Sequence, residues 1–324
     1  MSFIDASERL ILMDMQLDYA NPEIPRLPED NIQMLVDAGI RTAMIFTVYW
    51  GFIEPQKGVY NWDYYGDRIR LLNRCGMKVL LQCYNHHPGW IPDSWKAKRI
   101  DNILTAISPW NEEAQEYTLD FYRKMVKHYN SKSCIVVNSR EQDGETLMPQ
   151  HGLACYDDHA LADYKNKYGG EPSPHNPETE EWLKSTIVEQ HIKTQEILSV
   201  CGEVWTLLHP ALAFHYGCGC AWIDDVLNAY RTRMPDAEIN HIYCTWNYDH
   251  IAPYYTQMED WRDQYNENLY VGAEYATGVI DTTRKAIEHG IKGLLINPVH
   301  PYTGYTRIEP WMTDNIKKAL ELWP

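Results

Sequence analysis

Short apolar runs alternate with longer amphipathic segments along nearly the whole chain. The runs are rich in aliphatic residues and Tyr, as buried strands are, and the longer segments repeat apolar residues at helical spacing. One such segment begins at Asn61 and ends at Gly76, which are typical helix boundaries. We expect strands at 9–14, 42–50, 78–84, 133–139, 203–212, 238–246, 268–274 and 292–300. We expect helices at 29–40, 61–76, 111–130, 155–168, 177–200, 223–234, 256–266, 281–290 and 309–323.

This alternation predicts an α/β protein with parallel strands and right-handed helical crossovers. Eight strand–helix units in 324 residues fit a closed (β/α)8 barrel, or TIM barrel, as a single domain over 1–324. The polar, Gly- and Pro-rich segment 140–180 interrupts the rhythm and is expected to be an insertion after the fourth strand. An open doubly wound sheet is the alternative, but the chain lacks the G-x-G-x-x-G and P-loop motifs typical of that fold.

Composition and charge narrow the range of partners. Hydrophobic residues make up 44% and charged residues 23%, as in ordinary globular proteins. The net charge of −16 disfavours nucleic acid, whose phosphates an acidic surface repels. No apolar run approaches the roughly 20 residues that cross a bilayer, so we expect no membrane span. Residues 1–10 lack the basic start and apolar core of a signal peptide, and we therefore expect a cytoplasmic location.

The cysteines suggest neither disulfides nor a metal site. Eight are scattered along the chain without a C-x-x-C pair, and several fall within apolar runs. We expect free, buried thiols in a reducing compartment, and no cofactor or metal.

The side chains that follow the expected strands suggest a carbohydrate ligand. In a (β/α)8 barrel the active site is built at the carboxyl ends of the strands. The residues there are aromatic, amide, imidazole or carboxylate groups, with few cations that a phosphorylated substrate would need. Tyr and Trp, at 23 and 12 residues, far outnumber Phe at 5, and their amphipathic rings suit neutral sugars. The candidate substrate-binding residues are Asp14, Tyr49, Trp50, His86, Trp90, Asn138, Glu141, His209, Trp246, Asn247 and Tyr275.

Two carboxyl groups are needed to cleave a glycosidic bond, one as acid and one as nucleophile or base. Glu274 ends the seventh expected strand, and Glu141 and Glu145 follow the fourth. We favour Glu145 over Glu141 as the acid, because it follows Gly144 and precedes a Pro-bounded loop. Asn138 and Asn247 are expected to bind sugar hydroxyls. Trp50, Trp90 and Trp246 are expected to stack on sugar rings.

Residues near these strand ends are also expected to have structural roles. Glu54 lies in an E-P-x-x-G turn, where a structural role is expected. His86 and His87 are adjacent on a strand and point to opposite sides, so only one of them is expected to reach a sugar.

The segment YWGFIEPQKGVYNWDYYGDRIRLLNRCGMKVLLQ resembles the second βα unit of clan A barrel glycoside hydrolases, especially their β-galactosidases. HHPGWIP is similar to the segment after their third strand, and CYDDHALADYKNKYGG resembles the helix inserted after their fourth strand. The resemblance covers most of residues 40–170 and implies a barrel glycoside hydrolase acting on oligosaccharides or polysaccharides. It also implies that Glu274 stands where the clan carries its nucleophile.

The chain departs from the clan pattern at the end of the fourth strand. The clan has Asn-Glu there, with Glu as acid and base, whereas here Asn138 is followed by Ser139. DGETLMP instead is similar to the segment that carries the catalytic acid in the inverting β-amylases. We expect retention on a β-glycoside, with inversion still open. Some family members also carry a zinc-binding cysteine cluster, of which only Cys155 is present here, so no zinc is expected.

Two other functions fit the same sequence. A catalytically inactive barrel that binds carbohydrate would explain the missing Asn-Glu pair. A sugar isomerase or lyase would usually need a metal or a Lys base, and the strand ends show no clear cluster of either.

Overall fold

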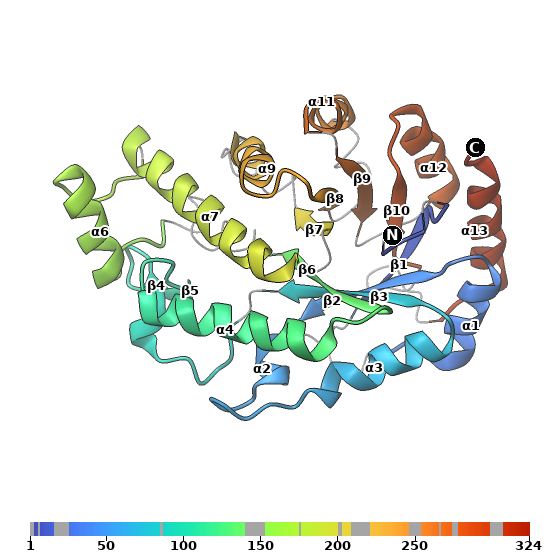
Figure 1. Ribbon diagram of the computed structural model, residues 1–324, viewed down its shortest axis with the longest axis horizontal. Helices are drawn as coiled ribbons and strands as arrows, with labels where there is room; N and C mark the ends of the chain where they lie inside the picture. Colours follow the sequence, from blue (N-terminus) through green and yellow to red (C-terminus); the bar gives the residue numbers. More distant parts are fainter. Residues whose placement is uncertain are drawn as a thin grey trace.

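Eight parallel strands close into a barrel surrounded by helices (Figure 1). The computed structural model describes residues 3–5, 7–15, 26–84, 87–139, 153–174, 176–199, 203–208, 221–245, 254–265, 267–273, 278–298 and 307–324. The barrel strands are β1 (Leu10–Met15), β2 (Thr42–Val48), β3 (Lys78–Tyr84), β6 (Cys134–Ser139), β7 (Glu203–Leu208), β8 (Glu238–Thr245), β9 (Asn268–Ala273) and β10 (Gly293–Ile296). Strand β1 pairs with both β2 and β10, which closes the ring and confirms the predicted (β/α)8 fold.

The helices follow the strands in the expected alternation. The long helix α4 begins after Asn111, whose side chain accepts a hydrogen bond from the Ala114 amide at 3.0 Å, as a helix cap does. The helices are α1 (Glu29–Asp37), α3 (Asp63–Arg74), α4 (Glu112–Tyr129), α6 (Asp158–Tyr168), α7 (Pro177–Leu198), α9 (Ala221–Arg233), α11 (Tyr255–Tyr265), α12 (Val279–Glu288) and α13 (Pro310–Leu322). Each of these lies within a few residues of its predicted range.

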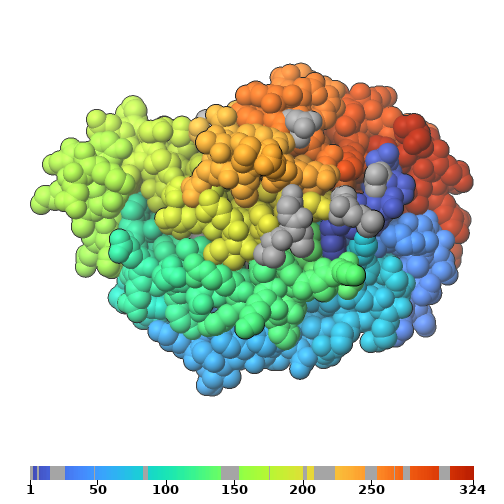
Figure 2. All heavy atoms as spheres, in the orientation of Figure 1, coloured from blue at the N-terminus to red at the C-terminus, as the bar shows by residue number. Residues whose placement is uncertain are grey.

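Three short elements were not predicted from the sequence. Helix α2 (Trp50–Ile53) follows β2 directly, and the single turn η1 (Asp93–Trp95) leads into a hairpin. The hairpin pairs β4 (Lys96–Lys98) with β5 (Leu104–Ile107) in antiparallel register. Together with α6, the hairpin extends to one side of the barrel, at the left of Figure 1 and Figure 2.

The core has two shells because each barrel strand buries both faces. Alternate residues such as Ile135 and Val137 of β6 point into the barrel, and their neighbours Cys134 and Val136 pack against the surrounding helices. Ile4 joins the inner shell and is only 2% exposed. The chain start thus covers the amino-terminal end of the barrel, where the Phe3 amide donates to Glu203 Oε1 at 2.6 Å.

A buried ion pair ties the first strand to helix α3. Arg68 donates from Nε and Nη2 to the two carboxylate oxygens of Asp14, both at 2.7 Å, and from Nη1 to the Leu27 carbonyl oxygen at 2.7 Å. Both side chains are 3% exposed. Asp14 therefore faces the helices rather than the barrel interior.

The cysteines whose side chains the structure describes, at positions 75, 134, 155 and 244, are buried, reduced thiols. Burial raises the pKa of Cys134 and of Cys155 to about 12. None of the helices described is both long and apolar enough to cross a bilayer.

Replacing Asp14 with Ala should lower the free energy of unfolding by about 3–5 kcal/mol, because Arg68 would keep a buried charge without its counter-ion. Urea titration followed by Trp fluorescence measures this change. The matched control is Asp63→Ala, which removes an exposed partner of Arg70 on the same helix and should cost at most about 1 kcal/mol. Equal costs for the two variants would contradict the structural role of the Asp14–Arg68 pair.

Candidate functional site

The carboxyl ends of β6 and β9 frame the candidate site. In the barrel order, β7 and β8 separate these two strands on one side and β10, β1, β2 and β3 on the other, so their ends lie nearly across the opening. The chain leaves β6 at Ser139 and β9 at Ala273. The candidate residues that follow these and neighbouring strands lie outside the described residues: His86, Glu141, Glu145, His209, Trp246, Asn247, Glu274 and Tyr275.

Gln82 and Ser139 close the barrel interior beneath the opening on the β3–β6 side. Both continue the inward-facing positions of their strands, and both are fully buried. Gln82 donates from Nε2 to Ser139 Oγ at 2.9 Å. Neither residue was among the candidate site residues predicted from the sequence. Gln82 could have been found there, because it is a single amide within an apolar run.

Asn138 faces the opposite way from Ser139. It is fully buried, and its Nδ2 donates to the carbonyl oxygen of His191 in α7 at 3.1 Å. The His191 ring contacts Thr206 Oγ1 at 3.2 Å and the Tyr230 hydroxyl. The structure thus directs Asn138 at a helix, where it fixes the end of β6 to α7.

Glu54 organises the turn after α2. It is fully buried, and its carboxylate accepts from Trp50 Nε1 and the Gly58 amide, both at 2.6 Å, and from the Tyr117 hydroxyl. Burial, followed by the hydrogen bond to Glu54, raises the pKa of Tyr117. The Glu54 carbonyl oxygen also accepts from Trp90 Nε1 at 2.8 Å. The carboxylate has the structural role expected from the E-P-x-x-G turn.

The three described aromatic candidates differ in exposure. Trp50 is 1% exposed and stacks on Phe121 with ring centroids 4.4 Å apart, so it packs the core and leaves no face for a sugar. Tyr49 is 9% exposed, and its amide donates to the Tyr65 hydroxyl at 2.8 Å. Trp90 lies edge-on to Trp50 at 6.1 Å and stays partly exposed.

His87, the neighbour of candidate His86, is tied to the hairpin. Its Nε2 lies 2.9 Å from the Thr105 carbonyl oxygen in β5. Across the ranges that the structure describes, no three His, Cys, Asp or Glu side chains come together in a way that could hold a metal ion.

Comparison with known protein families identifies the family of this chain. The model of the Glyco_hydro_42 family, described as β-galactosidase, matches residues 21–187, just over half of the 324-residue chain. The chain belongs to glycoside hydrolase family 42. The match runs from before β2 into α7, and therefore includes the Glu54 turn, the hairpin and α6.

A curated relative and two solved structures extend the comparison of this family-42 barrel. β-Galactosidase BbgII of Bifidobacterium bifidum is 26% identical over 118 residues, which are 33% of this chain and 17% of that protein. The β-amylase catalytic domain of Paenibacillus polymyxa has a TM-score of 0.68 at 11% identity, covering 99% of this chain and 100% of that one. The β-galactosidase of Halorubrum lacusprofundi has a TM-score of 0.63 at 11% identity, covering 97% of this chain and 57% of that one. At such identities the structural likeness shows the fold, and this chain spans only part of either β-galactosidase.

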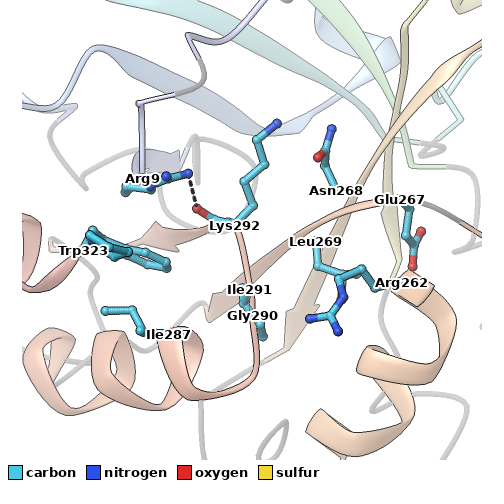
Figure 3. Close-up of a pocket in the computed structure, with 11 residues that line it drawn as sticks. Arg9, Arg262, Glu267, Asn268, Leu269, Ile287, Gly290, Ile291, Lys292 and Trp323 are labelled. Atoms are coloured by element: carbon cyan, nitrogen blue, oxygen red, sulfur yellow. Dashed lines mark hydrogen bonds between the residues drawn. The ribbon is translucent and has the colours of Figure 1, made fainter.

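A cavity of about 360 Å³ lies at the other edge of the family-42 barrel, where the strands begin (Figure 3). Arg9, Asn268 and Lys292 line it from the starts of β1, β9 and β10, and Arg9 lies over the Trp323 ring at 5.4 Å. Burial lowers the pKa of Lys292. Catalysis in (β/α)8 barrels takes place at the carboxyl ends of the strands, so we do not place the candidate active site in this cavity.

Replacing Tyr117 with Phe should lower the free energy of unfolding by about 1.5–3 kcal/mol, because the hydroxyl donates to a buried carboxylate. Urea titration followed by circular dichroism measures the loss. Tyr168→Phe, at a side chain that is 40% exposed, serves as the control and should change stability little. If Tyr117→Phe is as stable as the unaltered protein, the Glu54 turn does not depend on this hydrogen bond.

Proposed function

We propose that this family-42 barrel hydrolyses β-glycosidic bonds of oligosaccharides or polysaccharides, with a β-galactoside as substrate. The observation that carries the proposal is the pair of strand ends, β6 and β9, that face each other across the opening of the closed barrel. Each is followed in the sequence by a candidate glutamate. The names of the β-galactosidase relatives support the choice of sugar.

Glu274 is proposed as the nucleophile. The inward-facing positions of β9 are Tyr270 and Gly272, and 274 is the next position of the same parity. A Cβ at Gly272 would lie 2.9 Å from Leu295 Cβ and 3.5 Å from Cys244 Sγ, so a larger residue there would push β9 away from its neighbours. This close packing supports β9 as a rigid base for a reacting carboxylate.

Glu145 is proposed as the general acid. The inward-facing residue at the end of β6 is Ser139, which has no carboxyl group and is bonded to Gln82, so the acid is assigned to the segment that follows. Glu141, the nearer carboxyl in the sequence, remains the alternative. The acid needs a pKa raised above that of a free carboxyl, so that it holds a proton near neutral pH.

The proposed reaction has two steps, in which a glycosyl–enzyme intermediate forms and is then hydrolysed. The Glu274 carboxylate attacks the anomeric carbon while the bond to the leaving oxygen breaks, and Glu145 gives that oxygen its proton. In the second step the Glu145 carboxylate removes a proton from water, which attacks the anomeric carbon and releases Glu274. We propose His86, Trp90, His209, Trp246, Asn247 and Tyr275 as sugar contacts, and we give Asp14, Trp50 and Asn138 positioning roles.

Ser139 favours one alternative function. Because a buried serine stands where the clan carries its acid and base, a barrel that binds carbohydrate without turnover is the second candidate. The two functions differ in one measurement, the release of sugar from a glycoside by the purified chain.

Glu145→Gln should reduce kcat/KM for a chromogenic β-galactoside by about 10²–10⁴-fold, the usual contribution of a general acid. Glu274→Gln should lose at least as much, because no covalent intermediate could form. Both variants should retain sugar binding by calorimetry. Glu321→Gln on the exposed face of α13 is the control. An unaltered chain that binds sugar but never releases product would support the second candidate, and a loss in Glu141→Gln alone would move the acid to that residue.

The first product anomer seen by proton NMR should have the β configuration of the substrate, since the proposed mechanism passes through two displacements. The spectrum is recorded within the first minutes, before mutarotation mixes the anomers. An α product would overturn retention and make Glu274 the base that activates water.

A further inference from the structure

A polar groove of about 600 Å³ lies on the outer surface of the barrel, between α4, α6 and α7. Figure 1 shows α4 and α7 next to each other, with α6 beyond their ends. The groove residues of α4 belong to its first half, from Glu112 to Leu119, and that helix starts at the end of the barrel where β3 finishes. The groove is therefore near the carboxyl edge of the barrel but outside its opening.

Most charged groups of the groove are paired, either within the groove or with Arg123 and Arg233 beside it. Lys167 pairs with Asp163 at 2.9 Å, and Lys193 lies 3.6 Å from Glu189, which also pairs with Arg233 at 2.8 Å. Glu116 pairs with Arg123 at 2.7 Å, and Glu112 lies in the first turn of α4, where the helix dipole stabilises its charge. The groove thus has little net charge to attract an ionic ligand.

The groove also contains neutral hydrogen-bonding groups, one of them a buried amide oxygen without a partner in the described part of the chain. Gln190 is 7% exposed and donates from Nε2 to the Pro109 carbonyl oxygen at 3.4 Å, while its Oε1 has no hydrogen-bond partner in the described part of the chain. The hydroxyls of Ser185 and Thr186 donate to the Trp182 carbonyl oxygen at 2.9 and 2.8 Å, which leaves their lone pairs to accept. Trp110 Nε1 also has no hydrogen-bond partner among the described residues, so the groove offers an unpaired donor as well as acceptors. Hydroxyl groups of a ligand both donate and accept, and so match this mixture.

An aromatic side chain adds an apolar surface to the same groove. Trp110 lines it and is partly exposed. Its ring stacks on Trp182 with centroids 4.4 Å apart and planes at 21°, so the indole is held rigidly. A rigid indole beside hydroxyl, amide and ammonium groups matches the alternating C–H and O–H surfaces of a sugar.

We propose that this groove is a second carbohydrate-binding site, which holds a neutral polysaccharide chain away from the site of hydrolysis. This inference rests on the proposed function, which determines the polysaccharide that we expect to bind. The groove would lower KM for a long substrate and leave the hydrolysis of a small glycoside unchanged, because a single sugar does not reach both sites.

Native gel electrophoresis through soluble β-1,4-galactan, and separately through soluble starch, tests the proposal. The chain carries Glu274→Gln in these gels so that the polymer is not consumed. We expect the galactan to retard the protein, because the proposed substrate is a β-galactoside, and starch, an α-glucan, is the comparison polymer. Adding Gln190→Leu or Thr186→Val should weaken the apparent affinity about fivefold, as expected for one lost hydrogen bond.

Thr232→Val is the matched control. Thr232 donates to the Asn228 carbonyl oxygen at 2.8 Å, just as Thr186 donates within α7, but it lies on α9 outside the groove. It should leave retardation unchanged. Circular dichroism melting checks that each variant is folded, and Gln190→Leu with an active Glu274 should hydrolyse a chromogenic β-galactoside at the unaltered rate.

Two results would overturn the groove as a binding site. One is the absence of retardation by the galactan, and the other is equal retardation of the groove variants and the Thr232→Val control. Because the gel needs no turnover, these results are separate from a failure of hydrolysis. Cleavage of the chromogenic glycoside without groove-dependent retardation overturns the groove alone, and groove-dependent retardation without cleavage overturns the hydrolase alone.

Discussion

Closure of eight parallel strands into one barrel determines which side chains can reach a ligand. Each strand alternates between the barrel interior and the helices, so a shift of one residue changes a group's surroundings completely. At the end of β6, Ser139 bonds to Gln82 inside the barrel while Asn138 bonds to the His191 carbonyl of α7 outside it. The same rule sends Asp14 of β1 to Arg68 on α3. Alternation along each strand thus decides whether a polar group near the carboxyl end faces the barrel interior or the surrounding helices.

The sequence does not reveal which strand residues face the barrel interior and which face the helices. The order of strands and helices could be predicted because apolar runs and caps mark them, but both faces of a barrel strand are buried. Their sequences are therefore nearly continuous apolar runs, in which the period of two is invisible. Asp14 and Asn138 were chosen for standing at strand ends, yet their side chains point to the helices. The β4–β5 hairpin was missed for a different reason, since strands of three and four residues carry too few apolar positions to form a pattern.

The described residues of the segment that carries the family resemblance stabilise the fold. In W-x-x-x-E-P-x-x-G, the Glu54 carboxylate holds the Trp50 indole and the Gly58 amide, and its backbone carbonyl holds the Trp90 indole. Trp50 was expected to stack on sugar because Trp often does, but its hydrogen bond and its contact with Phe121 turn it into the core. A family motif can thus specify many positions because a turn needs several particular hydrogen-bonding residues. The family match over 21–187 covers this turn and ends before β7 begins.

The two proposed carboxyl groups differ in how the barrel holds them, and that difference bears on the stereochemistry. Glu274 is one residue beyond β9, whose packing at Gly272 leaves little freedom, whereas Glu145 is six residues beyond β6. Six extended residues span up to about 20 Å, far more than the difference between the carboxyl separations of about 5.5 Å and about 6.5–9.5 Å that distinguish retention from inversion. On the proposed assignment, the end of β9 constrains where Glu274 starts, and the length of chain after Ser139 allows Glu145 a wide range of separations from it. It follows that the barrel strands alone do not decide between retention and inversion.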